Sequence, residues 1–201
     1  MSTAGIVLCG GQSIRMGRPK AWLPIAGEFM LGRIVRLLGA VPLSPIVVVA
    51  APDQDLPPLT AGVEVVRDAE KGRGPLQGLA AGLAALSGRA EAAYVSSCDV
   101  PFLRPAFVRR LIELRGEHAI CVPELGGYRH PLGAVYRLDV ASVVGQLLAE
   151  DRLKSALLFD HAPTRFVYAE ELVDVDSELM SLLNVNTPEE YERAQREVEG
   201  T

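Results

Sequence analysis

The 201-residue chain is short of cysteine, of long hydrophobic runs and of positive charge. Its three cysteines, Cys9, Cys98 and Cys121, lie far apart and form no C-x-x-C pair, so we expect free thiols that pack as small hydrophobic groups in a reducing cytoplasm. The most apolar stretch, residues 40–51, contains two prolines and is too short to span a bilayer. Because no basic segment precedes the first strand-like run, the sequence predicts neither export nor membrane insertion.

The scarcity of positive charge limits the possible partners. The chain has 20 basic and 25 acidic residues, a formal net charge of -5. This balance argues against a partner such as duplex nucleic acid, although a local group of cations can still hold a nucleotide or a phosphorylated metabolite. Repeats, low-complexity tracts and linkers are lacking too, so we predict a single domain over residues 1–201. At that length a compact fold buries about 70% of the surface of its unfolded chain, enough for a core without disulfides.

What is present is an alternation of short β-branched runs with helical patterns. The runs cover residues 5–9, 45–50, 63–67 and 92–98, with helical patterns between the first three and before the fourth. Leucine, isoleucine and valine residues at helical spacing mark residues 31–38 and 76–86 as helices that cover a sheet. Such alternation predicts parallel strands joined by crossover helices.

The pattern changes in the second half of the chain. Residues 120–123 and 132–137 flank Gly126 and Gly127, which predicts a turn between strands and hence a mixed sheet. Asp139 is expected to cap a helix, and the Thr187-Pro188 pair to begin the last one. The predicted fold class is α/β: a three-layer α/β/α, Rossmann-like domain with a mixed, mainly parallel central sheet and its site at the carboxyl ends of the strands.

A glycine-rich, basic loop follows the first strand. It contains Gly10 and Gly11, and then the three cations Arg15, Arg18 and Lys20. Glycines let the backbone approach a phosphate closely, and the cations neutralise its charge. The spacing matches neither of the common phosphate-binding fingerprints. The loop nevertheless predicts an anion site.

Further polar residues stand where other predicted strands or helices begin or end. Asp99 follows a buried strand, so it is the first candidate for a Mg²⁺ ligand, since this ion prefers oxygen donors. Gly74 and Pro75 lead into a helix whose amino terminus favours anions. Asn184 and Asn186 alternate in an extended segment, so their side chains face the same way.

Together these segments resemble a known family. The strings G-G-x-S-x-R-M-G-x-x-K, G-P-L-x-G-L, C-D-x-P-F, H-P and N-x-N-T-P-E occur here in the order found in the molybdenum cofactor guanylyltransferases, which share the sugar-nucleotide pyrophosphorylase fold. The resemblance implies nucleotide contacts at Leu8, Cys9, Gly10, Gly11, Lys20, Asp68, Gly74, Pro75, Gly78 and Asp99. It implies catalytic roles for Arg15, Lys20 and Asp99, a Mg²⁺ ion at Asp99 and Asn186, and acceptor binding by Arg129, His130, Asn184 and Asn186.

The implied reaction is transfer of GMP from GTP to the terminal phosphate of molybdopterin, with release of pyrophosphate. Transient contacts with proteins that deliver or receive the molybdenum cofactor are implied by the family alone. The chain departs from the family after its second strand, where Ala50, Ala51 and Pro52 stand in place of asparagines close to the base. These side chains cannot hydrogen-bond a base, so cytidylyl transfer stays open. So do a sugar- or polyol-phosphate nucleotidyltransferase and a nucleotide-binding regulator without catalysis.

Overall fold

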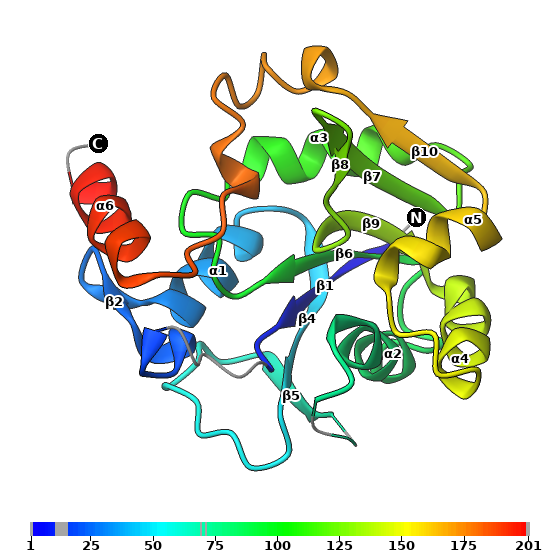
Figure 1. Ribbon diagram of the computed structural model, residues 1–201, viewed down its shortest axis with the longest axis horizontal. Helices are drawn as coiled ribbons and strands as arrows, with labels where there is room; N and C mark the ends of the chain where they lie inside the picture. Colours follow the sequence, from blue (N-terminus) through cyan, green and yellow to red (C-terminus); the bar gives the residue numbers. More distant parts are fainter. Residues whose placement is uncertain (1, 11–15, 69, 71, 200–201) are drawn as a thin grey trace.

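The computed structural model describes residues 2–10, 16–68, 70 and 72–199. They fold around one eight-stranded central sheet (Figure 1). The strands run in the order β10-β7-β9-β6-β1-β4-β5, and β8 pairs with β7. Their bounds are β1 Thr3–Leu8, β4 Leu43–Ala50, β5 Val63–Arg67, β6 Ala92–Ser97, β7 Ile120–Leu125, β8 Tyr128–Arg129, β9 Gly133–Arg137 and β10 Thr164–Val167. A separate hairpin joins β2 (Pro24–Ile25) to β3 (Glu28–Phe29).

The sheet is mixed, as predicted. Strands β6, β1, β4 and β5 are parallel to one another, whereas β9 is antiparallel to both of its neighbours, β6 and β7. Strand β10 is parallel to β7 at the far edge. The carboxyl ends of β1, β4 and β6 therefore lie together at one end of the strands, beside the amino end of β9.

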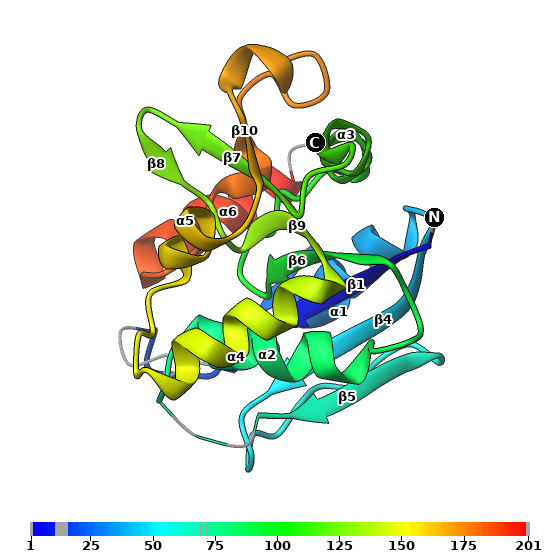
Figure 2. The same cartoon turned by 90° about the vertical axis from the view of Figure 1, so that its right-hand side faces the viewer.

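Helices cover both faces of the sheet, which confirms the three-layer architecture. Helices α1 (Met30–Gly39) and α3 (Pro105–Arg115) pack on one face, and α2 (Pro75–Ala85), α4 (Ala141–Ala149) and α5 (Leu158–His161) on the other. Figure 2 shows α2 and α4 side by side. Helix α6 (Pro188–Glu199) instead packs near the β2–β3 hairpin. Short 3₁₀ helices cover Lys20–Trp22, Leu138–Val140, Ser155–Leu157, Ala169–Glu171 and Met180–Leu182.

The central strands are buried on both sides because helices lie above and below them. Every residue of β6 is buried, and so are the last five of β1. On one face Ile6 and Val95 meet the leucines of α2, while on the other Val7 and Tyr94 lie under α1 and α3. No helix among the described residues is both long and apolar enough to cross a membrane.

Helix α2 approaches β1 so closely that one of its positions requires glycine. A Cβ atom on Gly82 would lie 2.8 Å from Cγ2 of the fully buried Ile6. We expect Gly82→Ala to lower the free energy of unfolding by about 1–3 kcal/mol, the usual cost of overpacking a core. Gly145→Ala in α4 is the matched control, because nothing lies within 4 Å of its Cβ position, and it should be neutral or stabilising by about 0.5–1 kcal/mol. Urea unfolding measures both, and equal effects of the two substitutions would contradict this packing argument.

Two details of the sequence prediction are wrong. Residues 51–62, between β4 and β5, form a loop without a helix, because its prolines and aspartates interrupt a helical pattern. Asp139 does not cap α4, since both of its carboxylate oxygens accept hydrogen bonds from Arg137, at 2.8 and 2.6 Å. The pattern also missed α3 and β10.

Candidate active site

The end of β1 lies directly against the end of β4. The amide of Cys9 donates to the carbonyl of Val49 at 2.8 Å, and that of Gly10 to the same oxygen at 3.3 Å. A Cβ atom on Gly10 would lie 3.3 Å from the nitrogen of Ala51, so a side chain there would press on the backbone. The Leu8 side chain turns to α2 and packs against Gly78. Of the predicted nucleotide contacts in this loop, Gly11 lies outside the described residues, as does Arg15.

Gln54 and Arg67 fix the loop that follows β4. The Gln54 side chain accepts a hydrogen bond from the amide of Ala51 at 3.0 Å and donates one to the carbonyl of Cys9 at 3.1 Å. The Arg67 guanidinium donates to the carbonyls of Ala51 and Gln54 at 3.1 and 2.6 Å. Sequence reasoning missed both residues, because their partners are backbone atoms. The loop that lacks the family's asparagines is thus held by the Gln54 amide.

The predicted residues Lys20, Asp99 and Asn186 come together at the carboxyl end of β6. Lys20 Nζ lies 2.6 Å from Asp99 Oδ2 and donates a hydrogen bond of 2.8 Å to Asn186 Oδ1. The side chains of Lys20 and Asp99 are only 16% and 12% exposed, so water screens this ion pair less than one at the surface. Residues from three distant parts of the chain therefore meet around one ammonium group.

Asn184 holds Asp99 from the other side. Its Nδ2 donates to Asp99 Oδ1 at 2.7 Å and to the hydroxyl of Ser97 at 3.1 Å. The backbone joins the two segments as well, since Val185 donates its amide to the Asp99 carbonyl at 2.9 Å. Ser97 was missed in the sequence, where it looked like part of a buried strand. Both carboxylate oxygens of Asp99 thus have hydrogen-bond donors.

The start of α6 positions Asn186. Glu190 Oε2 accepts hydrogen bonds from the amides of Asn186 and Thr187, at 2.6 and 3.1 Å, and the Glu190 amide donates to Thr187 Oγ1 at 3.2 Å. This reciprocal arrangement is a capping box, and it confirms the predicted helix start. The Tyr191 hydroxyl also donates to the carbonyl of Pro24, which ties α6 to β2.

We expect Glu190→Ala to lower both stability and activity. Loss of the cap should cost about 1 kcal/mol. The family resemblance implies that Asn186 helps to hold a metal ion, so loosening Asn186 should lower kcat/KM about 10-fold, the usual effect of losing a group that orients a metal ligand. Thermal unfolding and steady-state kinetics measure the two effects. Glu192→Ala, an exposed residue of the same helix, is the control, and an equal loss of activity in it would refute a specific role for Glu190.

The other predicted nucleotide contacts lie around the entries to α2 and the end of β5. Gly74 has φ 77°, a conformation that favours glycine, and Pro75 begins α2. Arg73 anchors this turn by donating to the Leu148 carbonyl and to Asp151 Oδ1, both at 3.0 Å. Asp68 is half-buried, and its amide donates to the Ala50 carbonyl at 2.8 Å. This places Asp68 next to the loop after β4.

The predicted acceptor residues Arg129 and His130 have different surroundings. Arg129 donates to Glu124 Oε2 at 3.1 Å, and its guanidinium lies 4.5 Å from the ring centroid of Phe166. Its charge therefore faces β7 and β10. His130 accepts a hydrogen bond from Gly133 at its carbonyl, and Gly133 pairs with Ser96 of β6, so His130 lies near the Asp99 end of the sheet. Burial lowers the pKa of His130, which keeps its ring neutral at pH 7.

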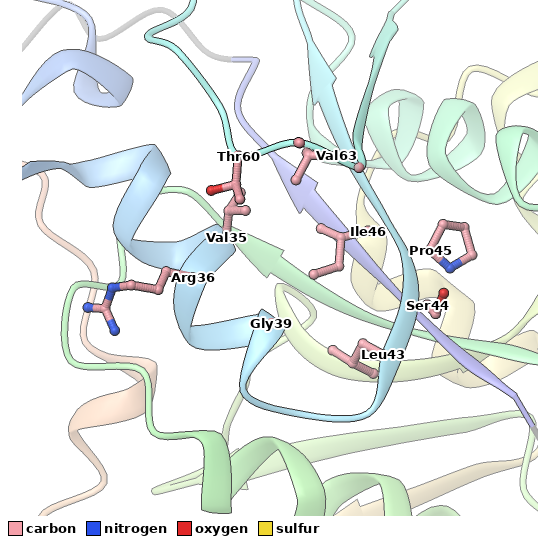
Figure 3. Close-up of a pocket in the computed structure, with 11 residues that line it drawn as sticks. Val35, Arg36, Gly39, Leu43, Ser44, Pro45, Ile46, Thr60 and Val63 are labelled. Atoms are coloured by element: carbon pink, nitrogen blue, oxygen red, sulfur yellow. The ribbon is translucent and has the colours of Figure 1, made fainter.

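A cavity of about 400 Å³ lies at the opposite end of the strands (Figure 3). Its walls come from α1 and from the amino ends of β4 and β5, including Val35, Leu43, Ile46 and Val63. Asp99 and Asn186 are not among its lining residues. We place the candidate site at the polar cluster rather than at this cavity, because the cluster brings a carboxylate, an amide and an ammonium group together.

Comparison with known proteins now decides the family. The profile of the MobA-like NTP transferase domain matches residues 5–164. The chain belongs to this family. A relative from Mycolicibacterium paratuberculosis, described as a probable molybdenum cofactor guanylyltransferase, is 36% identical over 195 residues, covering 93% of this chain and 92% of the relative.

Solved structures agree with this family fold. The Archaeoglobus fulgidus molybdopterin-guanine dinucleotide biosynthesis protein A superposes with a TM-score of 0.81 at 22% identity, covering 98% of this chain and 100% of that one. A manganese complex of Rv0371C from Mycobacterium tuberculosis gives a TM-score of 0.70 at 19% identity, covering 98% and 99%. By its family, the chain is a nucleotidyltransferase. The fold described above is the fold of that family.

The cluster around Asp99 suits the divalent metal that this enzyme family uses. The described residues contain no group of three or more His, Cys, Asp or Glu side chains that would form an all-protein metal site. Mg²⁺ in nucleotide sites commonly needs only one or two carboxylates, with phosphates and water as the other ligands. Asp99 Oδ2 and Asn186 Oδ1 already converge on one cationic group, the Lys20 ammonium. Their oxygens therefore fit a hard cation.

Proposed function

We propose that this chain transfers GMP from GTP to the terminal phosphate of molybdopterin and releases pyrophosphate, in the cytoplasm. The observation that carries the proposal is the convergence of Lys20, Asp99 and Asn186 at the carboxyl end of β6, in a member of the MobA-like NTP transferase family. The name of the Mycolicibacterium relative supports the choice of substrates. The three buried free thiols suit a reducing compartment.

In this proposal each residue of the cluster has a distinct task. Asp99 and Asn186 hold Mg²⁺, which when bound neutralises charge on the triphosphate and the leaving pyrophosphate. Lys20 turns from Asp99 towards the α-phosphate and stabilises the charge that develops there. Asn184 keeps Asp99 in place through its 2.7 Å hydrogen bond. Arg15, outside the described residues, is assigned to the outer phosphates.

The chemistry requires positioning rather than a general base. The terminal phosphate of the acceptor is largely ionised near neutral pH, so one of its oxygens attacks the α-phosphorus directly. The new P–O bond forms as the bond to pyrophosphate breaks, in line with it. His130, with Asn184 and Asn186, is placed on the acceptor side as a neutral hydrogen-bonding group. Arg129 joins that set only if it leaves Glu124, with which it now pairs at 3.1 Å.

The nucleotide contacts follow the two strand ends and the start of α2. The backbone of Leu8, Cys9 and Gly10 faces the triphosphate, while Asp68 and the Gly74-Pro75 turn lie towards the nucleoside, as the family resemblance implies. Gly78 acts through packing on Leu8. Proteins that deliver or receive the cofactor are proposed as transient partners.

A second candidate is transfer of CMP. It is favoured by the loop after β4, where Ala51 replaces a side chain that could read guanine and the Gln54 amide is occupied by Ala51 and Cys9. A site without hydrogen bonds to the base discriminates poorly between nucleotides.

Pyrophosphate release from GTP and, separately, from CTP tests both candidates. The assay contains Mg²⁺ and molybdate-loaded molybdopterin, and it compares the wild type with Asp99→Ala and with Asp139→Ala. Asp139 is the control because it lies at the other end of the sheet, after β9. Release with GTP that only Asp99→Ala abolishes supports the proposal. Release with CTP alone favours the second candidate, and release with neither nucleotide overturns both.

A further inference from the structure

Cys9 and Cys98 stand beside each other, just beyond the ends of two neighbouring parallel strands. Strands β1 and β6 pair in register as far as Leu8 and Ser97, and the Cys98 amide donates to the Leu8 carbonyl at 3.1 Å. The next position along both strands places the two cysteines opposite each other. Adjacent strands lie about 4.8 Å apart, which is within the Cα–Cα range of disulfides, about 4.4–6.8 Å.

The two thiols also point to the same face of the sheet. Alternate strand residues share a face, and both cysteines belong to the core beneath α1 and α3, as do Val7 and Tyr94. Gln54 Nε2 lies 3.4 Å from Cys9 Sγ as a hydrogen-bond donor. The two side chains therefore lie on neighbouring strands within one cluster of the core.

We propose that Cys9 and Cys98 form an oxidation site that closes to an intramolecular disulfide when the protein meets a small peroxide. Hydrogen peroxide oxidises one thiol to a sulfenic acid and leaves as water. The other thiol then attacks that sulfur, the S–S bond forms and a second water is released. Each residue is 6% exposed, so the oxidant that enters must be small.

Closure affects the neighbouring polar cluster, a consequence that rests on the proposed function. An S–S bond is about 2.05 Å long, shorter than any contact between two separate thiols. Its formation removes the Cys9 sulfur from Gln54 and draws in the chain at Cys98, the residue before Asp99. The disulfide thus joins the nucleotide loop to the segment that carries the metal ligand. We expect nucleotidyl transfer to fall on oxidation and to return on reduction.

Peptide mapping tests the oxidation site without any substrate. The full chain is treated with hydrogen peroxide, its remaining thiols are alkylated after denaturation, and peptides are identified by mass spectrometry. We expect Cys9 and Cys98 to be linked and Cys121 to be alkylated, because β9 lies between β7, which carries Cys121, and β6. Cys121→Ala should keep the link, and Cys98→Ala should lose it. Alkylation of both Cys9 and Cys98 in the treated wild type, or a link to Cys121, would overturn the proposal.

Activity then tests the consequence, with each protein compared with its own untreated sample. Wild type and Cys121→Ala should lose about 10-fold or more of their pyrophosphate release, since displacement of a site by about 1 Å costs that much, and should regain it with dithiothreitol. Linked protein with full activity would refute the effect on catalysis. Linked protein whose reduced form releases no pyrophosphate with either nucleotide would refute the proposed function and leave the oxidation site standing.

Discussion

Asp99→Asn is expected to lower kcat/KM for nucleotidyl transfer about 1000-fold, or about 4 kcal/mol of transition-state stabilisation. The substitution keeps the size of the side chain and the acceptor for Asn184, so the fold should persist. It removes the negative charge that pairs with Lys20 and that, in the proposed function, holds Mg²⁺. The kinetics should be measured across a range of Mg²⁺ concentrations, because a weakened metal site shows a raised Mg²⁺ requirement as well as a lower maximum.

Asp139→Asn is the matched control for this experiment. Asp139 forms hydrogen bonds of 2.8 and 2.6 Å with Arg137, but it lies at the far end of the sheet from Asp99. Its kcat/KM should stay within about 2-fold of the wild type, since exposed ion pairs contribute little. Asp99→Asn with wild-type kinetics, or an equal loss in Asp139→Asn, would rule out Asp99 as the metal ligand.

Lys20→Met is expected to lower kcat/KM about 100-fold while increasing the stabilisation that Mg²⁺ gives to the protein. The ammonium lies 2.6 Å from Asp99 Oδ2 and 2.8 Å from Asn186 Oδ1, at the point where these oxygens converge. The substitution removes a positive charge that stabilises the transition state, which is worth about two orders of magnitude in rate. It also frees the oxygens for the cation, and a ligand that binds the folded state stabilises it.

Thermal unfolding with and without Mg²⁺ separates these two effects. The rise in Tm on adding Mg²⁺ should be larger for Lys20→Met than for the wild type, and it should be absent for Asp99→Asn. Lys20→Arg should recover little activity, because the planar guanidinium presents its donors in a fork rather than at one point. An unchanged Mg²⁺-dependent Tm shift in Lys20→Met would show that the lysine and the metal do not share the oxygens.

The sequence predicted the layers and the edge of the sheet that carries the cluster, for a physical reason. Parallel strands share the direction of their carboxyl ends, so polar residues that follow β1 and β6 had to meet. Residues 184–186 follow Asp99 by a long stretch of chain with several turns. Their return to Asp99 depends on tertiary packing, and only the family resemblance indicated it.

The sequence could not predict hydrogen bonds to backbone atoms, nor which of several possible partners a charged side chain would bind. Gln54 has an ordinary side chain in an exposed-looking loop, yet it joins the segments after β1 and β4. Aspartate is a common helix-capping residue, yet the carboxylate of Asp139 is hydrogen-bonded by the nearby Arg137. Arg129 has a charge suited to a phosphate, yet two phenylalanine rings and Glu124 hold it. In each case a residue close in space, but distant in the sequence or outside the motif, determined the outcome.

Under the proposed function, the reversed direction of β9 brings a segment for the acceptor to the same end of the strands as the segments for the nucleotide. Since β9 is antiparallel to β6, the segment in front of β9, with His130, reaches the same edge as the segments behind β1, β4 and β6. The segment in front of β9 and the segments behind β1, β4 and β6 belong to different parts of the chain, and residues 182–186 pack between them. Under the proposed function, insertions or exchanges between β7 and β9 would alter the choice of acceptor while the hydrogen bonds among Lys20, Asp99 and Asn186 stay as they are. One triphosphate site could then serve several acceptors.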